Sequence, residues 1–257
     1  MDATIKTGFI EKWEKYFPGS ELPIACFYSD SLCGAEPAAL PKPGDKGYSC
    51  VFGQLAAVRA GNPRAFNGEN LGCSGAIRAL GFSVNAPTRE EAAYLVDFLV
   101  TKEKFYQSAA TVDAMMQGNP SLPARGKHLI FKRWDALGKT DTPQVVCFFA
   151  DPDTVSGLHA LANYDSMTPH AVLVPFSSGC NTLVGFAMKE LDSTEPRAVL
   201  GGLDPSARPY MKPSLLTFST PWPKFLGMLE NMDRCFLTTT VWNILKKRGR
   251  TRANDSF

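Results

Sequence analysis

Three of the seven cysteines, Cys50, Cys73 and Cys180, each stand directly before a segment whose composition predicts a helix. The N-terminus of a helix offers unpaired N–H groups and the positive end of the helix dipole, which favour a thiolate over a thiol. A thiolate binds metals and attacks electrophiles. The chain has no Cys-x-x-Cys pair, so the fold itself must gather these cysteines if they form one site.

Gathered together, Cys50, Cys73 and Cys180 would be ligands of an iron–sulfur cluster or of zinc. Three sulfur ligands leave one iron of a cubane, or one zinc position, open to a substrate or to water. The alternative is that the three are small buried hydrophobic residues, as free cysteines often are. We interpret Cys26 and Cys147, inside apolar segments, as buried side chains of that kind.

A glycine-rich stretch, residues 68–75, is the second candidate. A turn of this composition before a helix can direct backbone N–H groups at an anion. No lysine follows at the position that a phosphate-binding loop requires, so nucleotide hydrolysis is not expected. Gly72, Gly75 and Arg78 would instead bind a small anionic ligand, with Arg208 on a matching wall. The alternative is a tight turn with Arg78 exposed or paired with a carboxylate.

A cysteine-dependent enzyme acting on a small metabolite is an alternative from a different functional class. Cys73 or Cys180 would be the nucleophile, and a nearby histidine would activate it. Only His170 lies near a candidate cysteine in the sequence, ten residues before Cys180. We interpret His128 and His159 as structural or surface residues. A third alternative is an interaction module whose cysteines are merely buried.

The elements that must position these residues follow from hydrophobic spacing and from Gly and Pro positions. The patterns predict alternating helices and strands, and therefore an α/β or α+β fold. Helices are expected over residues 2–17, 51–60, 181–191, 224–235 and 238–245, another is expected to begin at Pro152, strands are expected over 23–28, 128–133, 145–150 and 215–220, and two helices covering a sheet are expected within 89–117.

Two stretches of the chain resemble each other and suggest an internal duplication. Residues 24–30 match residues 145–151 position by position, and Cys50 recurs as Cys180 at the same spacing at which Gly72 and Arg78 recur as Gly202 and Arg208. This order predicts two similar halves, about 20–137 and 142–235, with Cys50 and Cys180 facing each other. The alternative is that α/β proteins repeat such units without duplication.

Composition narrows the class of protein. The chain has 257 residues and a net charge of +2, but five of its 27 basic residues lie in the segment 246–257, which we expect to be a flexible basic tail. Without that segment 22 basic residues face 24 acidic ones, so the body carries −2 and no nucleic-acid partner is expected. We expect one domain over residues 1–245, cytoplasmic and with no membrane contact, because neither a secretory signal nor an apolar run of bilayer length is present. The oligomeric state cannot be read from these patterns.

Four stretches together resemble the domain of unknown function 169 family. They are Pro23-Ile24-Ala25, Tyr48-Ser49-Cys50, residues 70–81 with Leu71-Gly72-Cys73-Ser74-Gly75, and residues 143–152 ending in Phe148-Phe149-Ala150-Asp151-Pro152. The resemblance spans roughly residues 20–230. It implies one cytoplasmic domain with cysteine-bearing loops, in a family that is bacterial and archaeal and has no established activity. The family's glycine- and cysteine-bearing turn in the second half reads Gly201-Gly202-Leu203-Asp204 here, so the resemblance carries no ligand over to that turn.

Overall fold

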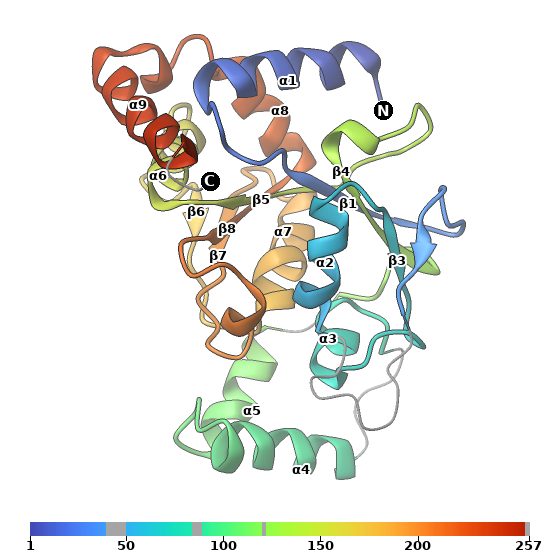
Figure 1. Ribbon diagram of the computed structural model, residues 1–257. Coiled ribbons are helices and arrows are strands. Elements are labelled where there is room, and N and C mark those ends of the chain that lie inside the picture. Colours follow the sequence, from blue (N-terminus) through green and yellow to red (C-terminus); the bar gives the residue numbers. More distant parts are fainter. Residues whose placement is uncertain (40–49, 84–88, 120–121, 255–257) are drawn as a thin grey trace.

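A mixed sheet forms the centre of the molecule (Figure 1). The computed structural model describes residues 1–39, 50–83, 89–119 and 122–254, and these residues form an eight-stranded sheet. Across the sheet the strands are β2 (Glu36–Pro37), β3 (Arg64–Phe66), β4 (His128–Arg133), β1 (Ile24–Ser29), β5 (Val145–Ala150), β8 (Leu216–Pro221), β7 (Ala198–Gly201) and β6 (Val172–Leu173). The predicted α/β class is confirmed.

The strand order repeats on either side of the central β1–β5 pair. Strands β2-β3-β4-β1 on one side correspond to β6-β7-β8-β5 on the other, each in the order outer edge to centre. The pairings agree as well: β2–β3 and β6–β7 are parallel, whereas β3–β4, β7–β8, β4–β1 and β8–β5 are antiparallel. This order is what the predicted duplication would produce, and the duplication itself stays a prediction.

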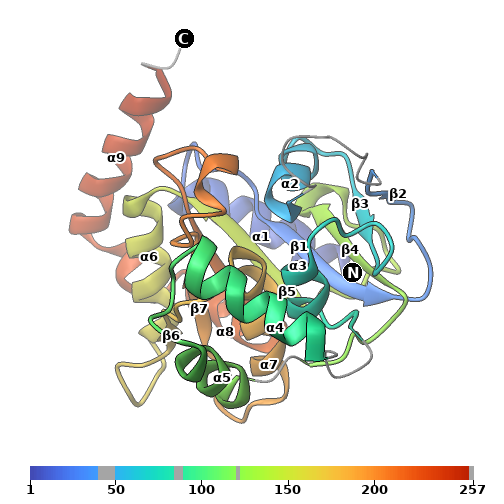
Figure 2. The same cartoon turned by 90° about the horizontal axis from the view of Figure 1, so that it is seen from below.

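Helices cover both faces of the sheet (Figures 1 and 2). One face packs on α1 (Ala3–Tyr16), α6 (Pro152–Asn163), α8 (Trp222–Asn231) and α9 (Thr240–Asn254). The other packs on α2 (Val51–Arg59), α3 (Ser74–Ala79) and a continuous helix made of η3 (Asn181–Gly185) and α7 (Phe186–Lys189). Single turns of 3-10 helix lie at η2 (Trp134–Ala136), η4 (Glu190–Asp192), η5 (Arg208–Tyr210) and η6 (Phe236–Thr238).

Strand β5 shows why the sheet needs both layers. All six of its residues are buried, so its apolar run must be covered on both faces. Val146 and Phe148 join the core beneath α1 and α8, whereas Cys147 and Phe149 join the core beneath α2 and η3. Asp151 then caps α6, because its carboxylate accepts the Thr154 N–H at 2.8 Å.

The two helices expected within residues 89–117 are present, but they do not cover the sheet. α4 (Arg89–Asp97), η1 (Phe98–Lys102) and α5 (Ala109–Gly118) form an arm that projects from the body (Figures 1 and 2). That part of the prediction is wrong. Within this α4–α5 arm Tyr94 stacks on Phe98, yet the two side chains stay 65% and 36% accessible, and Val112 is the buried residue of α5.

Helix α9 runs through most of the basic segment 246–257, and residues 255–257 lie outside the described part of the chain. The flexibility expected there stays a prediction, as does the single domain over 1–245. Residues 40–49, which include Tyr48 and Ser49 of the family resemblance, also lie outside the described part of the chain. Among the helices that are described, none combines the length and the apolar character needed to span a bilayer.

Candidate functional site

The segments that carry Cys50, Cys73 and Cys180 meet on one side of the sheet. Cys50 precedes α2, Cys73 precedes α3, and Cys180 lies in the helical turn before η3. Helix α3 packs against η3, and Phe52 of α2 shares a core with Cys180. The fold therefore brings to one side of the sheet three cysteine-bearing segments that are far apart in the sequence.

Gly179 makes the close approach between these segments possible. A Cβ atom on Gly179 would stand 2.7 Å from Cε2 of Phe52 and 2.8 Å from Cβ of Ala207. Both distances are shorter than real Cβ contacts, so any side chain here would push the start of α2 away from Cys180. Gly185 has the same function at the other end of η3, where its Cβ would lie 3.0 Å from the Ala79 carbonyl oxygen of α3.

Asp204 fixes the segment before Cys180 to the turn that follows β7. One carboxylate oxygen of Asp204 accepts the Gly179 N–H at 2.8 Å, and the other accepts the Ser206 N–H at 2.9 Å. Its backbone carbonyl accepts the N–H groups of Ala207 and Arg208, which closes the turn. Asp204 is 9% accessible. Sequence reasoning did not select this residue, although it follows Gly202 in the turn where the chain departs from the family pattern.

Burial works against the thiolate character expected at the helix starts. Burial raises the pKa of the Cys50 thiol, and the N–H groups of Phe52 and Gly53 lower it by a smaller amount. The predicted effect of the helix start is therefore present but is outweighed. Cys180 is buried more deeply, and burial raises its pKa well above the ordinary value.

The acidic groups of the site also influence one another. After burial, negative charge on Cys50, Cys73 and Asp204 raises the pKa of the Cys180 thiol. Charge on Cys73 and Asp204 raises the pKa of Cys50 in the same way. We refer to Cys50, Cys73, Cys180 and Asp204 as the cysteine corner.

The cysteine corner is not preorganised around a metal ion. Within residues 1–39, 50–83, 89–119 and 122–254, no group of three or more His, Cys, Asp or Glu side chains is arranged to hold one. Metal binding would have to draw the sulfur atoms closer together. Cys73 is the exposed member of the group, and its Sγ lies 3.5 Å from the position of a Cβ on Gly75.

The turn before α3 is built by asparagines rather than by a ligand-binding loop. Asn67 accepts the N–H groups of Glu69 and Asn70, and buried Asn70 accepts the Asn67 N–H and donates to the Ala65 carbonyl. Gly72 is half-buried at the end of this turn. The helix that follows has only six residues, which gives it too small a dipole for a strong anion site.

The two arginines predicted to face an anion, Arg78 and Arg208, have different hydrogen-bond partners in the structure. The guanidinium of Arg208 donates to the carbonyl oxygens of Gly202, Leu215 and Pro213, so its donors stabilise the turns around β7 and β8. We therefore leave Arg208 out of the site. Arg78 lies half-buried in α3 and forms no ion pair with any residue in the described part of the chain, and its predicted anion contact stays a prediction.

The remaining cysteines have structural surroundings. Cys26 and Cys147 are fully buried on neighbouring strands, with their thiols beside each other, and the Cys147 Sγ–H donates to the Leu183 carbonyl at 3.4 Å. Burial raises the pKa of Cys26 well above its ordinary value. Cys235 is buried in the other core, and Cys33 is half-buried beside Ser29 and Ser31.

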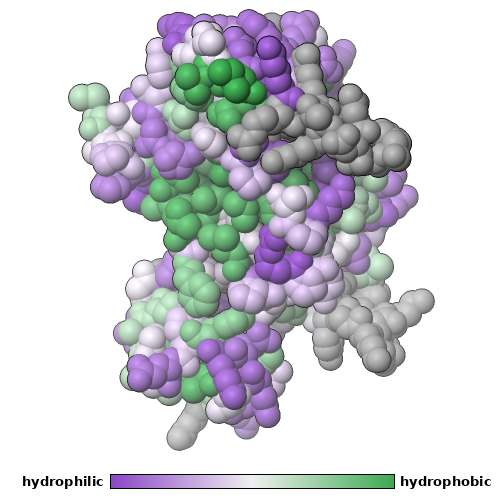
Figure 3. Space-filling view, turned by 60° about the vertical axis from the view of Figure 1, so that its left-hand side comes forward, coloured by the Kyte–Doolittle hydropathy of each residue, from purple (hydrophilic) through white to green (hydrophobic). Residues whose placement is uncertain are grey.

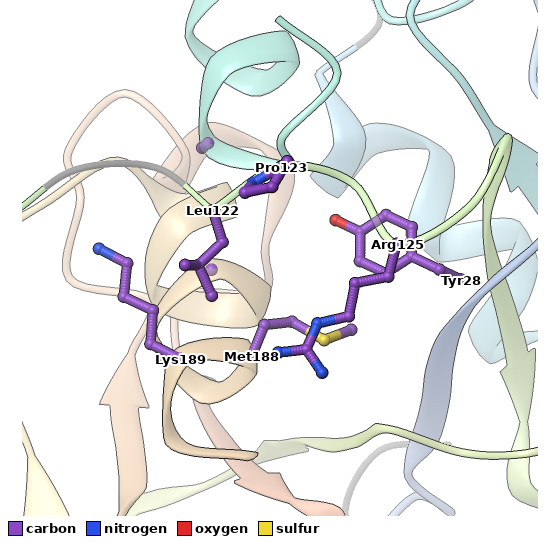
Figure 4. A pocket seen from close by; sticks show the side chains of 8 residues that line it. Tyr28, Leu122, Pro123, Arg125, Met188 and Lys189 are labelled. Atoms are coloured by element: carbon purple, nitrogen blue, oxygen red, sulfur yellow. The ribbon is translucent and has the colours of Figure 1, made fainter. Parts of the chain in front are cut away.

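A small pocket beside α3 carries two cationic side chains (Figure 4). Tyr28, Leu122, Pro123, Arg125, Met188 and Lys189 line it. Its volume of about 10 Å³ suffices for about one water molecule. Arg125 is paired with Asp192, and Lys189 extends away from Arg125 to donate to Asn119. Neither cation is available to a larger anion, so we do not place a ligand there.

An apolar hollow separates the body from the α4–α5 arm (Figure 3). Val174, Phe176, Leu203 and Tyr210 are exposed on the body, between 41% and 57% accessible. The ring of Phe176 contacts those of Phe105 and Tyr106, and Glu103 accepts a hydrogen bond from Ser206 at 2.6 Å. The arm is thus attached beside Asp204, close to the cysteine corner.

Comparison with protein families agrees with the sequence resemblance. The family DUF169, described as "Uncharacterised ArCR", matches residues 20–231. The chain belongs to this family. The matched segment contains every residue of the cysteine corner. No curated protein and no solved structure is detectably similar to the chain.

Proposed function

We propose that this protein is a thiolate-based binding protein that holds a metal ion or an iron–sulfur cluster between its two halves, with Cys50, Cys73 and Cys180 as ligands. The observation that carries the proposal is the meeting of the three cysteine-bearing segments at one place. Cys50 and Cys180 come from different halves of the sheet. Buried cysteines used only for packing would have no need to share one corner.

The charge balance of the cysteine corner supports a cation. Negative charge on Cys73 or Asp204 raises the pKa of the Cys50 thiol, and charge on Cys50, Cys73 or Asp204 raises that of the Cys180 thiol, so ionised Cys50 and Cys180 are unfavourable without a ligand. A bound cation reverses this effect, because metal coordination removes the protons from cysteine ligands. Exposed Cys73 leaves one side of the corner open for metal entry.

Zinc and an iron–sulfur cluster both fit a set of three sulfur ligands. Either would have to draw the sulfur atoms together, and the gain in stability on binding would offset the cost of that movement. A cysteine-nucleophile enzyme has less support at Cys180, because burial raises the pKa of its thiol, and His170, the histidine nearest to it in the sequence, is exposed. The anion-binding alternative has lost Arg208 as a contact.

The test is metal analysis of protein purified without oxygen. The protein would be isolated anaerobically, and separate samples would be reconstituted with zinc or with iron and sulfide. An iron–sulfur cluster would give broad absorbance near ~400 nm, whereas zinc would bind in stoichiometric amount without colour. X-ray absorption of the loaded protein would show sulfur scatterers at about 2.3 Å if zinc is bound.

Matched cysteine variants identify the ligands. C50A, C73A and C180A should each lower metal content by at least about tenfold, in line with the loss of a metal ligand. C33A and C235A, which remove cysteines outside the corner, should leave it unchanged. The proposal fails if neither metal form binds, or if the triple variant of Cys50, Cys73 and Cys180 binds as much metal as the wild type.

A further inference from the structure

A cavity of about 140 Å³ lies where the ends of α1 and β5 meet the starts of α6 and α9 (Figure 1). We refer to it as the α6–α9 pocket. No residue of the cysteine corner lines it. A cavity of about 150 Å³ accommodates benzene, so the α6–α9 pocket has room for a ligand of similar size.

Aromatic rings form much of the wall of the α6–α9 pocket. Tyr16, Phe17, Phe149 and Trp242 line it, and each is no more than 6% accessible. The Trp242 indole N–H donates to the Tyr16 carbonyl at 2.8 Å, and the Trp242 ring meets the Phe17 ring edge-on. A Cβ on Gly157 would stand 2.9 Å from both of these rings, so the glycine lets them pack against α6. Packing thus holds the rings in place, and the pocket is preformed.

Two of these rings already carry cations of the protein itself. The Nζ atoms of Lys15 and Lys246 lie 4.6 and 6.0 Å from the centroid of the Tyr16 ring. The Cζ atom of Arg59 lies 4.7 Å from the centroid of the Phe149 ring. The face of an aromatic ring attracts a cation within about 6 Å, and pockets walled by such rings bind alkylammonium ions. The walls of the α6–α9 pocket therefore favour a cationic ligand.

The charged groups of the lining have the same preference. Three carboxylates line the pocket, those of Glu21, Asp151 and Asp153, against one ammonium group, that of Lys246. Glu21 is neutralised by Arg59, whose guanidinium donates to both carboxylate oxygens at 2.7 Å. The surplus of negative charge that remains opposes an anionic ligand and attracts a cation.

Asp151 is the carboxylate best suited to meet that cation. Its Oδ1 accepts the Thr154 N–H at 2.8 Å and so caps α6. Its Oδ2 accepts no hydrogen bond, and the side chain forms no ion pair, with any residue that the structure describes. Asp151 also belongs to the stretch 148–152 through which the chain resembles its family, and the proposed metal site makes no use of that stretch.

We propose that the α6–α9 pocket binds a small alkylammonium ion. The positive charge would lie at the Asp151 carboxylate, and the alkyl groups would contact the rings of Phe17, Phe149 and Trp242. A bare metal ion is not the expected ligand, because the described residues hold no group of His, Cys, Asp or Glu side chains arranged for one. The inference goes beyond the proposed metal centre and does not depend on it, since the cysteine ligands lie elsewhere.

The test compares tetramethylammonium with tert-butanol, which is neutral but of nearly the same size and shape. Isothermal titration calorimetry of the full chain measures both affinities. Tetramethylammonium should bind at one site per chain, and tert-butanol at least about tenfold more weakly, because it has no charge to interact with the rings and the carboxylate.

A matched pair of variants tests the assignment of Asp151. D151N should weaken tetramethylammonium binding by at least about fivefold, because it removes the charge. It should fold normally, since asparagine caps a helix as well as aspartate does. D192N, which removes an exposed carboxylate outside the pocket, should bind like the wild type.

Nuclear Overhauser contacts locate the bound ion. Its methyl protons should show contacts with the ring of Trp242 and none with the ring of Trp222, which does not line the pocket. The inference is overturned if the wild type shows no saturable binding of tetramethylammonium, or if tert-butanol binds equally well. An unchanged affinity in D151N, or contacts with Trp222 in place of Trp242, would overturn it too.

Discussion

Replacing Gly179 with alanine tests whether the close approach at the cysteine corner is real. The added Cβ would lie 2.7 Å from a ring carbon of Phe52 and 2.8 Å from Cβ of Ala207, at least about 0.6 Å inside the 3.4 Å at which ordinary contact begins. Phe52 is 2% accessible and packs edge-on to Phe149, so its ring cannot turn away freely. The Cβ of Ala207 moves only with its backbone.

Overpacking of this kind costs about 1–3 kcal/mol. Alanine regains up to about 1 kcal/mol over glycine in a helical position, so the net loss should be about 1–2 kcal/mol. For a chain of this size that corresponds to a fall in Tm of about 3–6 °C. Metal affinity should fall as well, because the start of α2 is pushed away from Cys180.

Thermal unfolding followed by circular dichroism measures the effect. The control is G8A, the same chemical change in α1 at a position with no neighbouring atom within 4 Å. That variant should be slightly more stable than the wild type, by about 0.5–1 kcal/mol. If G179A unfolds at the same temperature as the wild type, or at a higher one, Gly179 does not hold the two segments together as described.

Three further predictions follow from other contacts. D141N should lower the free energy of unfolding in urea by about 3–5 kcal/mol, because the charged groups of Lys132 and Asp141 are both buried and lie 2.8 Å apart. D165N, which removes the half-exposed partner of Lys224, should cost no more than about 1 kcal/mol. Equal effects of the two substitutions would contradict this prediction. Iodoacetamide should modify exposed Cys73 first, as followed by mass spectrometry. Cys50 and Cys180 should react slowly at pH 8 and faster above pH 9, because burial raises their pKa values and the thiolate fraction grows with pH. Fast modification of Cys180 at pH 7 would be incompatible with its burial. S206A should speed hydrogen exchange within the α4–α5 arm with little change in Tm, because it removes the Ser206–Glu103 hydrogen bond. An unchanged exchange rate would mean that the aromatic contacts of Phe176 alone hold the arm.

Local patterns were sufficient to predict the central elements. The apolar runs of β1 and β5 and the Asp-Pro start of α6 are signals that lie within a few residues of one another. The matching spacing of Cys50 and Cys180 suggested an internal duplication, which the strand order allows and which stays a prediction. Strands β2 and β6 have only two residues each, too few for any periodicity to show.

Long-range contacts account for what the sequence could not predict. The helical spacing of Tyr94 and Phe98 indicated an apolar face, but nothing in the spacing indicates whether that face meets a sheet or another helix. Arg208 was expected to face a ligand, and its donors are instead used by carbonyls of the neighbouring turns. Phe52 and Ala207 pack around Gly179, the residue before buried Cys180, and only the folded chain brings these residues together.

The antiparallel β1–β5 pair has a consequence for any shortened form of this protein. Cut between β4 and β5, each half-chain would carry a complete four-stranded sheet with its innermost strand left as a bare edge. Two copies of one half could then join edge to edge and rebuild the full sheet as a homodimer.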